Sequence, residues 1–310
     1  MSQWAVMFPG QGSQSVGMGQ LFFEQEETAR RTFEEADDAL GYALTQRIFA
    51  GPSEALKDTE VQQPAILTVS VAIWRVLKRW LPHFEPQVGL GLSLGEYSAY
   101  VAAGALEFPD AVRLTRIRGR AMQMAVPQGA GGMVAVLGLD GEQVESICRE
   151  ASQWGAVDPA NFNAPGQIVI SGLVEGLEVA ETLIRQAGGK AMRLSVSAPF
   201  HSRLLQGAGK VLGEALGAVA FSSARFPVIA NVDAELCQAP DAIIPRLVAQ
   251  VSRPVRFEAG IRLALQGGAT HFLELGPGRS LSNLVKKIDR GARVAAVENP
   301  EGLVKALELV

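Results

Sequence analysis

The sequence contains little cysteine and little histidine. Among its 310 residues there are two cysteines, Cys148 and Cys237, and three histidines. Two cysteines are too few for a disulfide framework. Cys148 also falls on the apolar stripe of a predicted helix, which favours a buried free thiol. Without a Cys/His cluster at ligand spacing, the sequence predicts no metal site.

The sequence also has no surplus of positive charge and no long apolar run. It carries 28 basic and 32 acidic residues, a net charge of −4, which argues against nucleic acid as a partner because phosphate neutralisation needs a basic surplus. The longest apolar segment, residues 65–81, is interrupted by Arg75, Lys78 and Arg79, so it predicts a core helix and not a membrane span. The first residues lack the pattern of a secretory signal. We therefore expect a cytoplasmic protein without membrane association.

Apolar material is plentiful, at 48% of the residues against 19% charged, and it is arranged in short runs. Predicted strands at Trp4–Phe8, Val88–Leu92 and His271–Leu275 each lead into a glycine-containing turn, and the last two continue into helices reaching about residues 105 and 288. Strands that feed helices through glycine turns predict an α/β domain with a mostly parallel, hydrolase-like sheet.

Residues 129–196 show a different pattern. Strands are predicted at 133–139, 157–163, 167–171 and 190–197, and helices at 141–152 and 174–187. The order β-α-β-β-α-β is the ferredoxin-like, split βαβ arrangement. We therefore expect a small ferredoxin-like domain at 129–196 inserted into a large α/β catalytic domain made of residues 1–128 and 197–310. A cleft between two such bodies is a common place for a substrate.

The strongest catalytic signal is a G-x-S-x-G motif, Gly91-Leu92-Ser93-Leu94-Gly95, located where a strand ends and a helix begins. Its glycines allow a sharp turn that pushes the serine hydroxyl out beside the helix N-terminus. The N–H of Leu94 can then donate to the oxyanion that forms when a carbonyl is attacked. A chance match in a glycine-rich protein is the alternative, but the strand–turn–helix context favours a nucleophile.

A serine nucleophile needs a base to take its proton. His83 lies in a polar connector and is expected at the surface, and His271 begins an apolar strand, which favours a structural role. His201 lies in Pro199-Phe-His201, where the chain returns from the predicted small domain and borders the cleft. His201 is therefore the best candidate base, against the alternative of a hydrogen-bonded structural histidine.

A glycine-rich turn, Pro9-Gly10-Gln11-Gly12, follows the first strand. It lacks the Lys-Ser/Thr of a phosphate-binding loop and the third glycine of a dinucleotide fingerprint. The glycine-flanked Gln11 could instead provide a backbone N–H as the second oxyanion donor. A tight turn without a function is the alternative.

Arg118 is placed differently from the other arginines of its predicted helix. At helical spacing Arg113, Arg116 and Arg120 share one face, which favours a solvated basic surface, whereas Arg118 points among apolar neighbours such as Leu114. A buried guanidinium needs an anionic partner, and a carboxylate fits its planar fork. A protein Asp or Glu could serve, and so could a substrate carboxylate.

Taken together, these segments resemble the malonyl-coenzyme A:acyl carrier protein transacylases, a family of acyltransferases of fatty-acid synthesis. The similarity covers nearly the whole chain, and its motifs are Phe8-Pro-Gly-Gln-Gly-Ser13, Gln63-Pro64, Gly91–Ser98, Arg118-Gly119, Asn161–Gln167, Pro199-Phe-His201, Asn231-Val-Asp233, Gln250 and Glu274–Gly278.

The resemblance implies a role for each matching residue. Ser93 becomes the acylated nucleophile and His201 its base. Gln11 and Leu94 provide the backbone N–H groups of the oxyanion hole. Gln250 orients the imidazole through its main-chain carbonyl, so that no triad aspartate is expected.

The resemblance also implies the substrates. Arg118 becomes the clamp on the malonyl carboxylate, malonyl-coenzyme A the donor, and the phosphopantetheine thiol of acyl carrier protein the acceptor in a ping-pong reaction with no bound cofactor or metal. Carrier proteins of this kind are acidic, so the basic face of the Arg118 helix or the pair Lys286-Lys287 could receive one, although solvated charge is the simpler interpretation. The chain departs from the family at Leu92, where histidine is usual. That imidazole is not the catalytic base, so we expect activity to survive, while pocket polarity and acyl selectivity stay open.

Three alternatives stay open at this point. The first is a free-standing acyltransferase of a polyketide synthase, with the same chemistry and another carrier. The second is a G-x-S-x-G hydrolase, whose late histidine would be His271. The third is a catalytically silent carrier-binding protein, which the presence of nucleophile, base and clamp disfavours.

Overall fold

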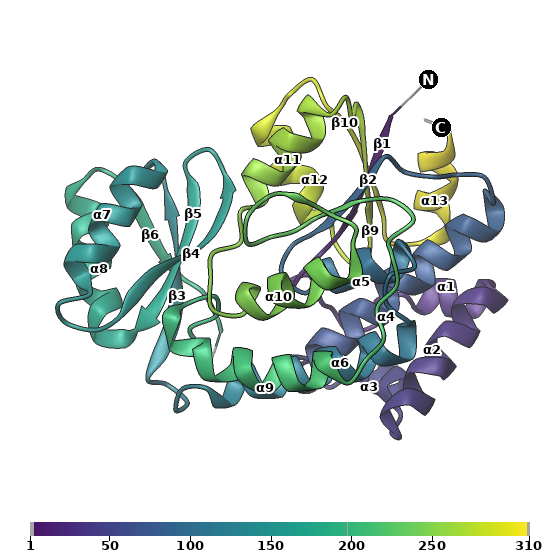
Figure 1. Ribbon diagram of the computed structural model, residues 1–310, viewed down its shortest axis with the longest axis horizontal. Helices are drawn as coiled ribbons and strands as arrows, with labels where there is room; N and C mark the ends of the chain where they lie inside the picture. Colours follow the sequence, from purple (N-terminus) through teal and green to yellow (C-terminus); the bar gives the residue numbers. More distant parts are fainter. Residues whose placement is uncertain (1–2, 197, 309–310) are drawn as a thin grey trace.

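The computed structural model describes residues 3–196 and 198–308 and forms two sheets, each with its own helices (Figure 1). The first part of the chain contains β1 (Trp4–Phe8), α1 (Gln20–Gln25), α2 (Glu27–Leu40), α3 (Leu44–Ala50), the 3-10 turn η1 (Ser53–Leu56), α4 (Thr59–Trp80), β2 (Val88–Gly91), α5 (Gly95–Ala102) and α6 (Phe108–Met124). The middle part contains β3 (Gly131–Leu137), α7 (Gly141–Ala151), β4 (Val157–Ala164), β5 (Gln167–Leu173), α8 (Val174–Gln186) and β6 (Lys190–Arg193). The last part contains η2 (Arg203–Leu205), α9 (Gln206–Gly217), β7 (Val228–Ile229), β8 (Leu236–Cys237), α10 (Pro240–Gln250), α11 (Phe257–Gln266), β9 (His271–Leu275), α12 (Ser280–Ile288), β10 (Arg293–Val297) and α13 (Pro300–Leu307).

The larger sheet has the strand order β10-β9-β1-β2-β7-β8. All neighbouring pairs are parallel except β7 and β8. Successive residues of β1 point to opposite faces, as the pleat requires: Met7 packs into the apolar cluster of α11 and α12, whereas Phe8 packs with α4 and α5. Helices therefore cover both faces of this sheet, and the predicted α/β class with a mostly parallel sheet is confirmed.

The smaller sheet has the order β4-β5-β3-β6 with every pair antiparallel. Its core joins the sheet to α7 and α8 through residues such as Val134, Val144 and Ile184. This is the predicted β-α-β-β-α-β arrangement, and it lies in the segment where the sequence predicts an inserted small domain. The boundary residue 197 lies outside the described residues.

The last strand of the smaller sheet is shorter than predicted. β6 ends at Arg193, although the apolar pattern suggested a strand as far as residue 197. Its pairing with β3 stops one hydrogen bond later, from the N–H of Leu194 to the carbonyl of Met133. Beyond that point the chain leaves the sheet edge to return to the larger part, so no partner strand holds it extended.

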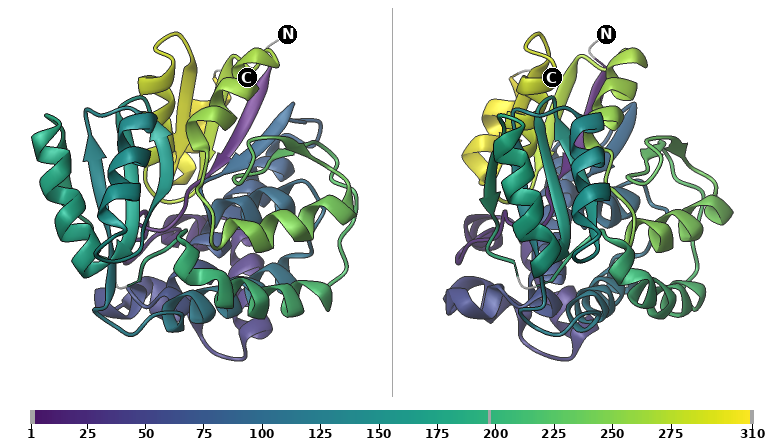
Figure 2. Two further views of the ribbon diagram at one scale, coloured as in Figure 1. Left: turned by 60° about the vertical axis from the view of Figure 1, so that its left-hand side comes forward. Right: turned by 90° about the vertical axis from the view of Figure 1, so that its left-hand side faces the viewer.

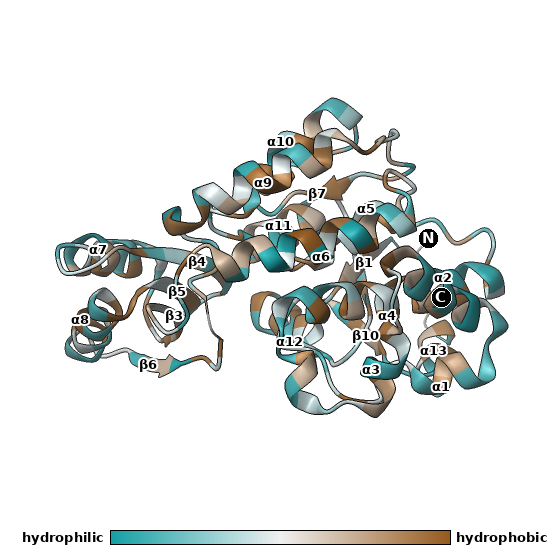
Figure 3. Ribbon diagram, turned by 90° about the horizontal axis from the view of Figure 1, so that it is seen from below, coloured by the Kyte–Doolittle hydropathy of each residue, from teal (hydrophilic) through white to brown (hydrophobic). Residues whose placement is uncertain are grey.

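The smaller sheet lies at one end of the long axis, at the left in Figure 1 and foremost in the right view of Figure 2. The larger sheet lies nearer the middle, and α1, α2 and α13 lie beyond it (Figure 1). α9 packs against α6 and α10. Hydrophobic and hydrophilic residues alternate along α9 and α10 (Figure 3), because each buries one face. Within the described residues no helix is long and apolar enough to cross a membrane.

Candidate active site

Ser93 lies on the sharp turn between β2 and α5. Its φ of 53° is in the left-handed region, which a residue with a side chain rarely adopts. The turn needs glycine at both flanks: a Cβ on Gly91 would lie 2.0 Å from the carbonyl carbon of Gly95, and one on Gly95 would lie 2.0 Å from the carbonyl oxygen of Phe8. The Ser93 N–H donates to Oδ1 of Asn231 at 2.6 Å, which holds the strained turn in place. The motif therefore forms the predicted nucleophile elbow.

His201 contacts the nucleophile directly. The Oγ of Ser93 lies 2.7 Å from Nε2 of His201, and Nδ1 lies 2.8 Å from the main-chain oxygen of Gln250. A carbonyl oxygen can only accept, so Nδ1 carries the proton and Nε2 is free to accept the proton of the serine hydroxyl. Burial, followed by the positive charge of Arg118, lowers the pKa of His201 to about 3. The imidazole is therefore neutral near pH 7, as a general base must be.

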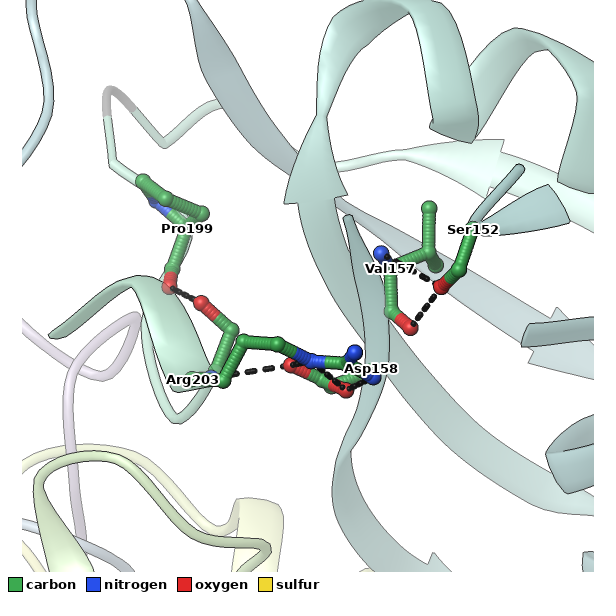
Figure 4. A network of polar contacts seen from close by, with 6 residues as sticks. Ser152, Val157, Asp158, Pro199 and Arg203 are labelled. Carbon is green, nitrogen blue, oxygen red and sulfur yellow. Dashed lines mark hydrogen bonds and ion pairs between the residues drawn. The ribbon is translucent and has the colours of Figure 1, made fainter. Parts of the chain in front are cut away.

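The loop that carries His201 is anchored to the small sheet by an ion pair. His201 has a φ of 59°, and the next two residues make hydrogen bonds that fix this loop. The hydroxyl of Ser202 donates to the carbonyl of Pro199 at 2.7 Å, and Arg203 makes an ion pair with Asp158 of β4, with Nε 2.8 Å from Oδ1 (Figure 4). The position of the base thus depends on both parts of the fold.

Arg118 is fully buried beside the nucleophile. Its Nη1 donates to Oε1 of Gln63 at 2.7 Å, and its Nη2 donates to Oγ of Ser93 at 2.9 Å and to Oε1 of Gln250 at 2.8 Å. Its Nε has no protein acceptor within the described residues. Its hydrogen-bond acceptors are thus neutral oxygens, and within the described residues Arg118 makes no ion pair with a carboxylate. Of the two anions considered from the sequence, a carboxylate of the described residues that contacts the guanidinium directly is therefore not found.

Gln11 and Leu94 lie on the two loops that meet at the elbow. A Cβ on Gly10 would lie 2.4 Å from the carbonyl oxygen of Leu92, so the loop after β1 runs directly against the turn. The side chain of Gln11 donates to Oε1 of Gln62 at 2.6 Å. Within residues 3–196 and 198–308, the main-chain N–H groups of Gln11 and Leu94 donate to no protein acceptor, which leaves them available to an oxyanion.

Leu92, the departure from the family pattern, packs against the apolar cluster between the large sheet and α11 and α12.

Two buried polar residues of the site were not singled out from the sequence. Glu96 follows the motif on α5, and its Oε2 accepts from the main-chain N–H of Asn231 at 3.0 Å and from Nε2 of Gln250 at 2.7 Å. Burial raises the pKa of Glu96 to about 7. The sequence signal was a glutamate among small and apolar residues. Gln63 was noted only as part of a shared motif.

The other two histidines lie elsewhere. His83 is exposed. His271 is buried, stacks on Trp4 with ring centroids 4.7 Å apart, and its Nδ1 lies 2.8 Å from the hydroxyl of Thr270. His271 makes no contact with Ser93, so the geometry does not support the hydrolase alternative that needed it.

The two basic patches differ in how free their charges are. Arg113 makes an ion pair with Asp110 at 2.7 Å, and Arg116 makes one with Glu60 at 2.8 Å, so the face they share with Arg120 is partly neutralised. Lys286 and Lys287 are exposed and hydrogen-bonded to oxygens of neutral groups.

A cavity of about 560 Å³ opens at the junction of the two parts. It is lined by Gln11, Gln14, Lys57, Asp58, Thr59, Gln62, Gln123, Gln128, Ser195, Val196 and Phe200. It reaches Gln11 and the neighbour of His201, but Ser93 itself is not in its lining. Within the described residues no group of His, Cys, Asp or Glu could hold a metal ion.

Comparison with known proteins agrees with this geometry. Residues 6–299 match the family described as the acyl transferase domain. The chain is 45% identical over 310 residues to the malonyl CoA-acyl carrier protein transacylase of Bacillus subtilis strain 168, covering 99% of this chain and 97% of the relative.

Solved structures agree as well. The malonyl CoA-acyl carrier protein transacylase of Clostridium perfringens superposes with a TM-score of 0.96 at 41% identity, covering 99% of this chain and 97% of the other. A malonyl-transacylase in complex with a type II polyketide synthase acyl-carrier protein superposes with a TM-score of 0.97 at 42% identity, covering 100% of both chains. The chain therefore belongs to the acyl transferase domain family.

Proposed function

We propose that this protein is an acyl-carrier-protein S-malonyltransferase, which moves a malonyl group from malonyl-coenzyme A to the phosphopantetheine thiol of an acyl carrier protein in fatty-acid synthesis. The observation that carries the proposal is the position of Arg118, whose Nη2 lies 2.9 Å from the nucleophilic Oγ of Ser93. A cation buried this close to the nucleophile favours an acyl group that has a carboxylate of its own. The names of the relatives point to the same reaction.

In the first half-reaction, Oγ of Ser93 attacks the thioester carbonyl while its proton passes to Nε2 of His201. The main-chain N–H groups of Gln11 and Leu94 stabilise the oxyanion. The carbon–sulfur bond then breaks, and His201 returns the proton to the leaving thiolate of coenzyme A. The malonyl-serine ester remains.

In the second half-reaction, His201 takes the proton of the carrier's thiol, and the sulfur attacks the ester carbonyl. The bond to Oγ of Ser93 breaks, and the serine recovers its proton from His201. Both steps are acyl and proton transfers that these side chains can perform. Coenzyme A and phosphopantetheine therefore enter as parts of substrates, and we expect no bound cofactor or metal.

The carrier and the compartment belong to the same proposal. A carrier of a polyketide synthase is the second candidate acceptor, because one structure of high similarity is a complex with such a carrier. We infer a cytoplasmic enzyme, since both cysteines are buried free thiols, as is typical of a reducing compartment.

Mass spectrometry of the intact protein mixed with malonyl-coenzyme A tests the proposal. We expect one malonyl adduct on Ser93, none on the Ser93→Ala variant, and discharge by a phosphopantetheinylated carrier faster than by water. Fatty-acid and polyketide carriers at equal concentration identify the acceptor. Discharge by water at the same rate would mean a hydrolase, and absence of any adduct would mean a silent carrier-binding protein.

A further inference from the structure

Among the residues that the structure describes, Glu96 is the one buried carboxyl group that reaches the catalytic residues through hydrogen bonds. It has no exposed surface. Its Oε2 accepts from Nε2 of Gln250 and from the main-chain N–H of Asn231, and its Oε1 has no partner within the described residues. A buried carboxylate that is only partly hydrogen-bonded is costly, so its presence beside the site calls for a reason.

Gln250 transmits the contact from Glu96 to both sides of the site. The Nε2 of Gln250 donates to Oε2 of Glu96 at 2.7 Å and to the main-chain oxygen of Ser93 at 3.0 Å. These bonds set the amide with its Oε1 facing Nη2 of Arg118 at 2.8 Å. The main-chain oxygen of the same residue accepts from Nδ1 of His201 at 2.8 Å. If the amide turned over, its N–H groups would face the guanidinium and the contact would be lost. Glu96, together with the carbonyl of Ser93, thus favours the orientation in which the oxygen of the Gln250 amide meets Arg118.

Charge balance gives Glu96 a second role. Arg118 is a fully buried cation whose hydrogen-bond acceptors are all neutral. Glu96 lies on the other side of the Gln250 amide from Arg118. When ionised, its negative charge partly balances the positive charge of Arg118, with the Gln250 side chain between them. A malonyl carboxylate at Arg118 would bring a second negative charge into the same buried volume. Two carboxylates that share one cation in a buried site do not both stay ionised easily.

We propose that Glu96 is a positioning residue that acts through Gln250, holds Arg118 ready for a carboxylate, and takes up a proton from water when the malonyl carboxylate binds. The inference rests on the proposed malonyl transfer. It adds that selectivity for the carboxylated acyl group depends on pH through a residue that does not touch the substrate.

Other titratable groups also act on Glu96. They are Arg118 on α6, Asp233 on the loop after β7, which is paired with Arg246 of α10, Cys237 of β8, and Tyr97 and Tyr100 on α5. Burial raises the pKa of both tyrosines far above neutrality, and burial also raises the pKa of Cys237. Burial raises the pKa of Glu96 to about 7, which puts its titration where the enzyme can be assayed. His201 does not interfere, since burial lowers its pKa to about 3.

The test compares malonyl- and acetyl-coenzyme A on the full-length protein between pH 6 and 8.5. In a ping-pong reaction, kcat/KM for the acyl donor reports only the acylation half-reaction, and the malonyl-to-acetyl ratio cancels pH effects common to both donors. In the wild type we expect this ratio to fall as pH rises through about 7, by up to about tenfold per pH unit for one proton taken up. In Glu96→Gln, whose amide oxygen can still accept from Gln250, the ratio should not change with pH and should exceed the wild-type ratio at pH 8.5.

Two further variants complete the design. Glu96→Ala removes the shorter of the two hydrogen bonds that hold the Gln250 amide and leaves the one to the Ser93 carbonyl, so kcat/KM for both donors should fall by about tenfold at every pH. Glu274→Gln is the matched control, because Glu274 is also buried but accepts from the main-chain N–H groups of Leu281 and Ser282. This control should keep the wild-type pH dependence.

The proposal is overturned if the wild-type ratio is independent of pH, if Glu96→Gln keeps the wild-type pH dependence, or if Glu274→Gln abolishes it as well. A higher ratio in Glu96→Gln at pH 8.5 cannot come from damaged folding. Failure of the malonyl assignment gives a separate result, namely equal losses for both donors in Arg118→Ala.

Discussion

Replacing Arg118 by alanine tests whether the buried guanidinium selects the acyl group. Two of its nitrogens donate three hydrogen bonds, to Gln63, Ser93 and Gln250. A substrate carboxylate would accept charge-assisted hydrogen bonds from the same fork, each contributing about 1.5–3 kcal/mol. Losing both arms of the fork costs about 3 kcal/mol or more. Since about 1.4 kcal/mol corresponds to a factor of ten, kcat/KM for malonyl-coenzyme A should fall by about a hundredfold or more.

Acetyl-coenzyme A should be much less affected, because it has no carboxylate to leave unpaired. Arg118→Ala removes the hydrogen bonds to Gln63, Ser93 and Gln250 with either donor, but of these only the bond to Ser93 reaches the reacting oxygen. Because the guanidinium is charged, such a bond contributes about 1.5 kcal/mol even to a neutral acceptor, so kcat/KM for acetyl-coenzyme A should fall by about tenfold. Lysine at position 118 should restore part of the malonyl rate, since it provides the charge without the planar fork.

The assay measures kcat/KM for both donors with the wild type, Arg118→Ala and Arg118→Lys, with far-UV circular dichroism as a check on folding. Arg113→Ala is the matched control, because Arg113 lies on the same helix but is exposed and paired with Asp110. Its rates should stay within about twofold of the wild type. Equal losses for malonyl and acetyl in Arg118→Ala would refute the reasoning and make Arg118 a structural residue.

Three other predictions follow from the geometry. His201→Ala should lower kcat/KM by about a thousandfold or more. His271→Ala removes only a ring stacked on Trp4 and should leave turnover nearly intact. The reverse result in a steady-state assay would favour the hydrolase alternative. Burial and then the charge of Arg118 lower the pKa of His201 to about 3, so the imidazole stays unprotonated at pH 5. We therefore expect kcat/KM for acetyl-coenzyme A to stay level from pH 7 down to about pH 5. With a base of ordinary pKa, kcat/KM would instead fall about tenfold for each pH unit below 6.5. Burial raises the pKa of Glu96 from 4.5 to about 7, so between these pH values the folded protein binds a proton that the unfolded chain has lost. The free energy of unfolding therefore falls as pH rises through this window, by about 3 kcal/mol at most. The melting temperature of Glu96→Gln should rise relative to that of the wild type from pH 5 to pH 8, and a constant difference between the two would contradict this.

Local patterns were enough to predict most of the fold and part of the site. The elbow at Ser93 could be recognised because its geometry depends on five consecutive residues, two of them glycines on which a Cβ would lie only 2.0 Å from backbone atoms. The βαββαβ order could be read from periodicity, because a helix with one buried face repeats about every 3.6 residues. The direction of Arg118 toward apolar neighbours followed from the same spacing, and the structure buries it fully.

The partners of these residues depended on tertiary structure. The base lies 108 positions from the nucleophile, and Gln250 lies a further 49 positions along the chain, so no local pattern could join them without the resemblance to a family. The end of β6 was wrong in the sequence prediction because it depends on where the chain leaves its partner strand.

The sequence by itself determined the elements, the elbow and the chemical types of the catalytic residues, because short-range sterics and side-chain periodicity act within a few residues. Only the tertiary structure decided that Arg118 meets neutral oxygens, and that Glu96 is linked to Arg118 through Gln250. The physical reason is the strand order β10-β9-β1-β2-β7-β8. It brings the ends of β1 and β2 and the loop after β7 together from distant parts of the chain, and burial then makes each charge there depend on its neighbours.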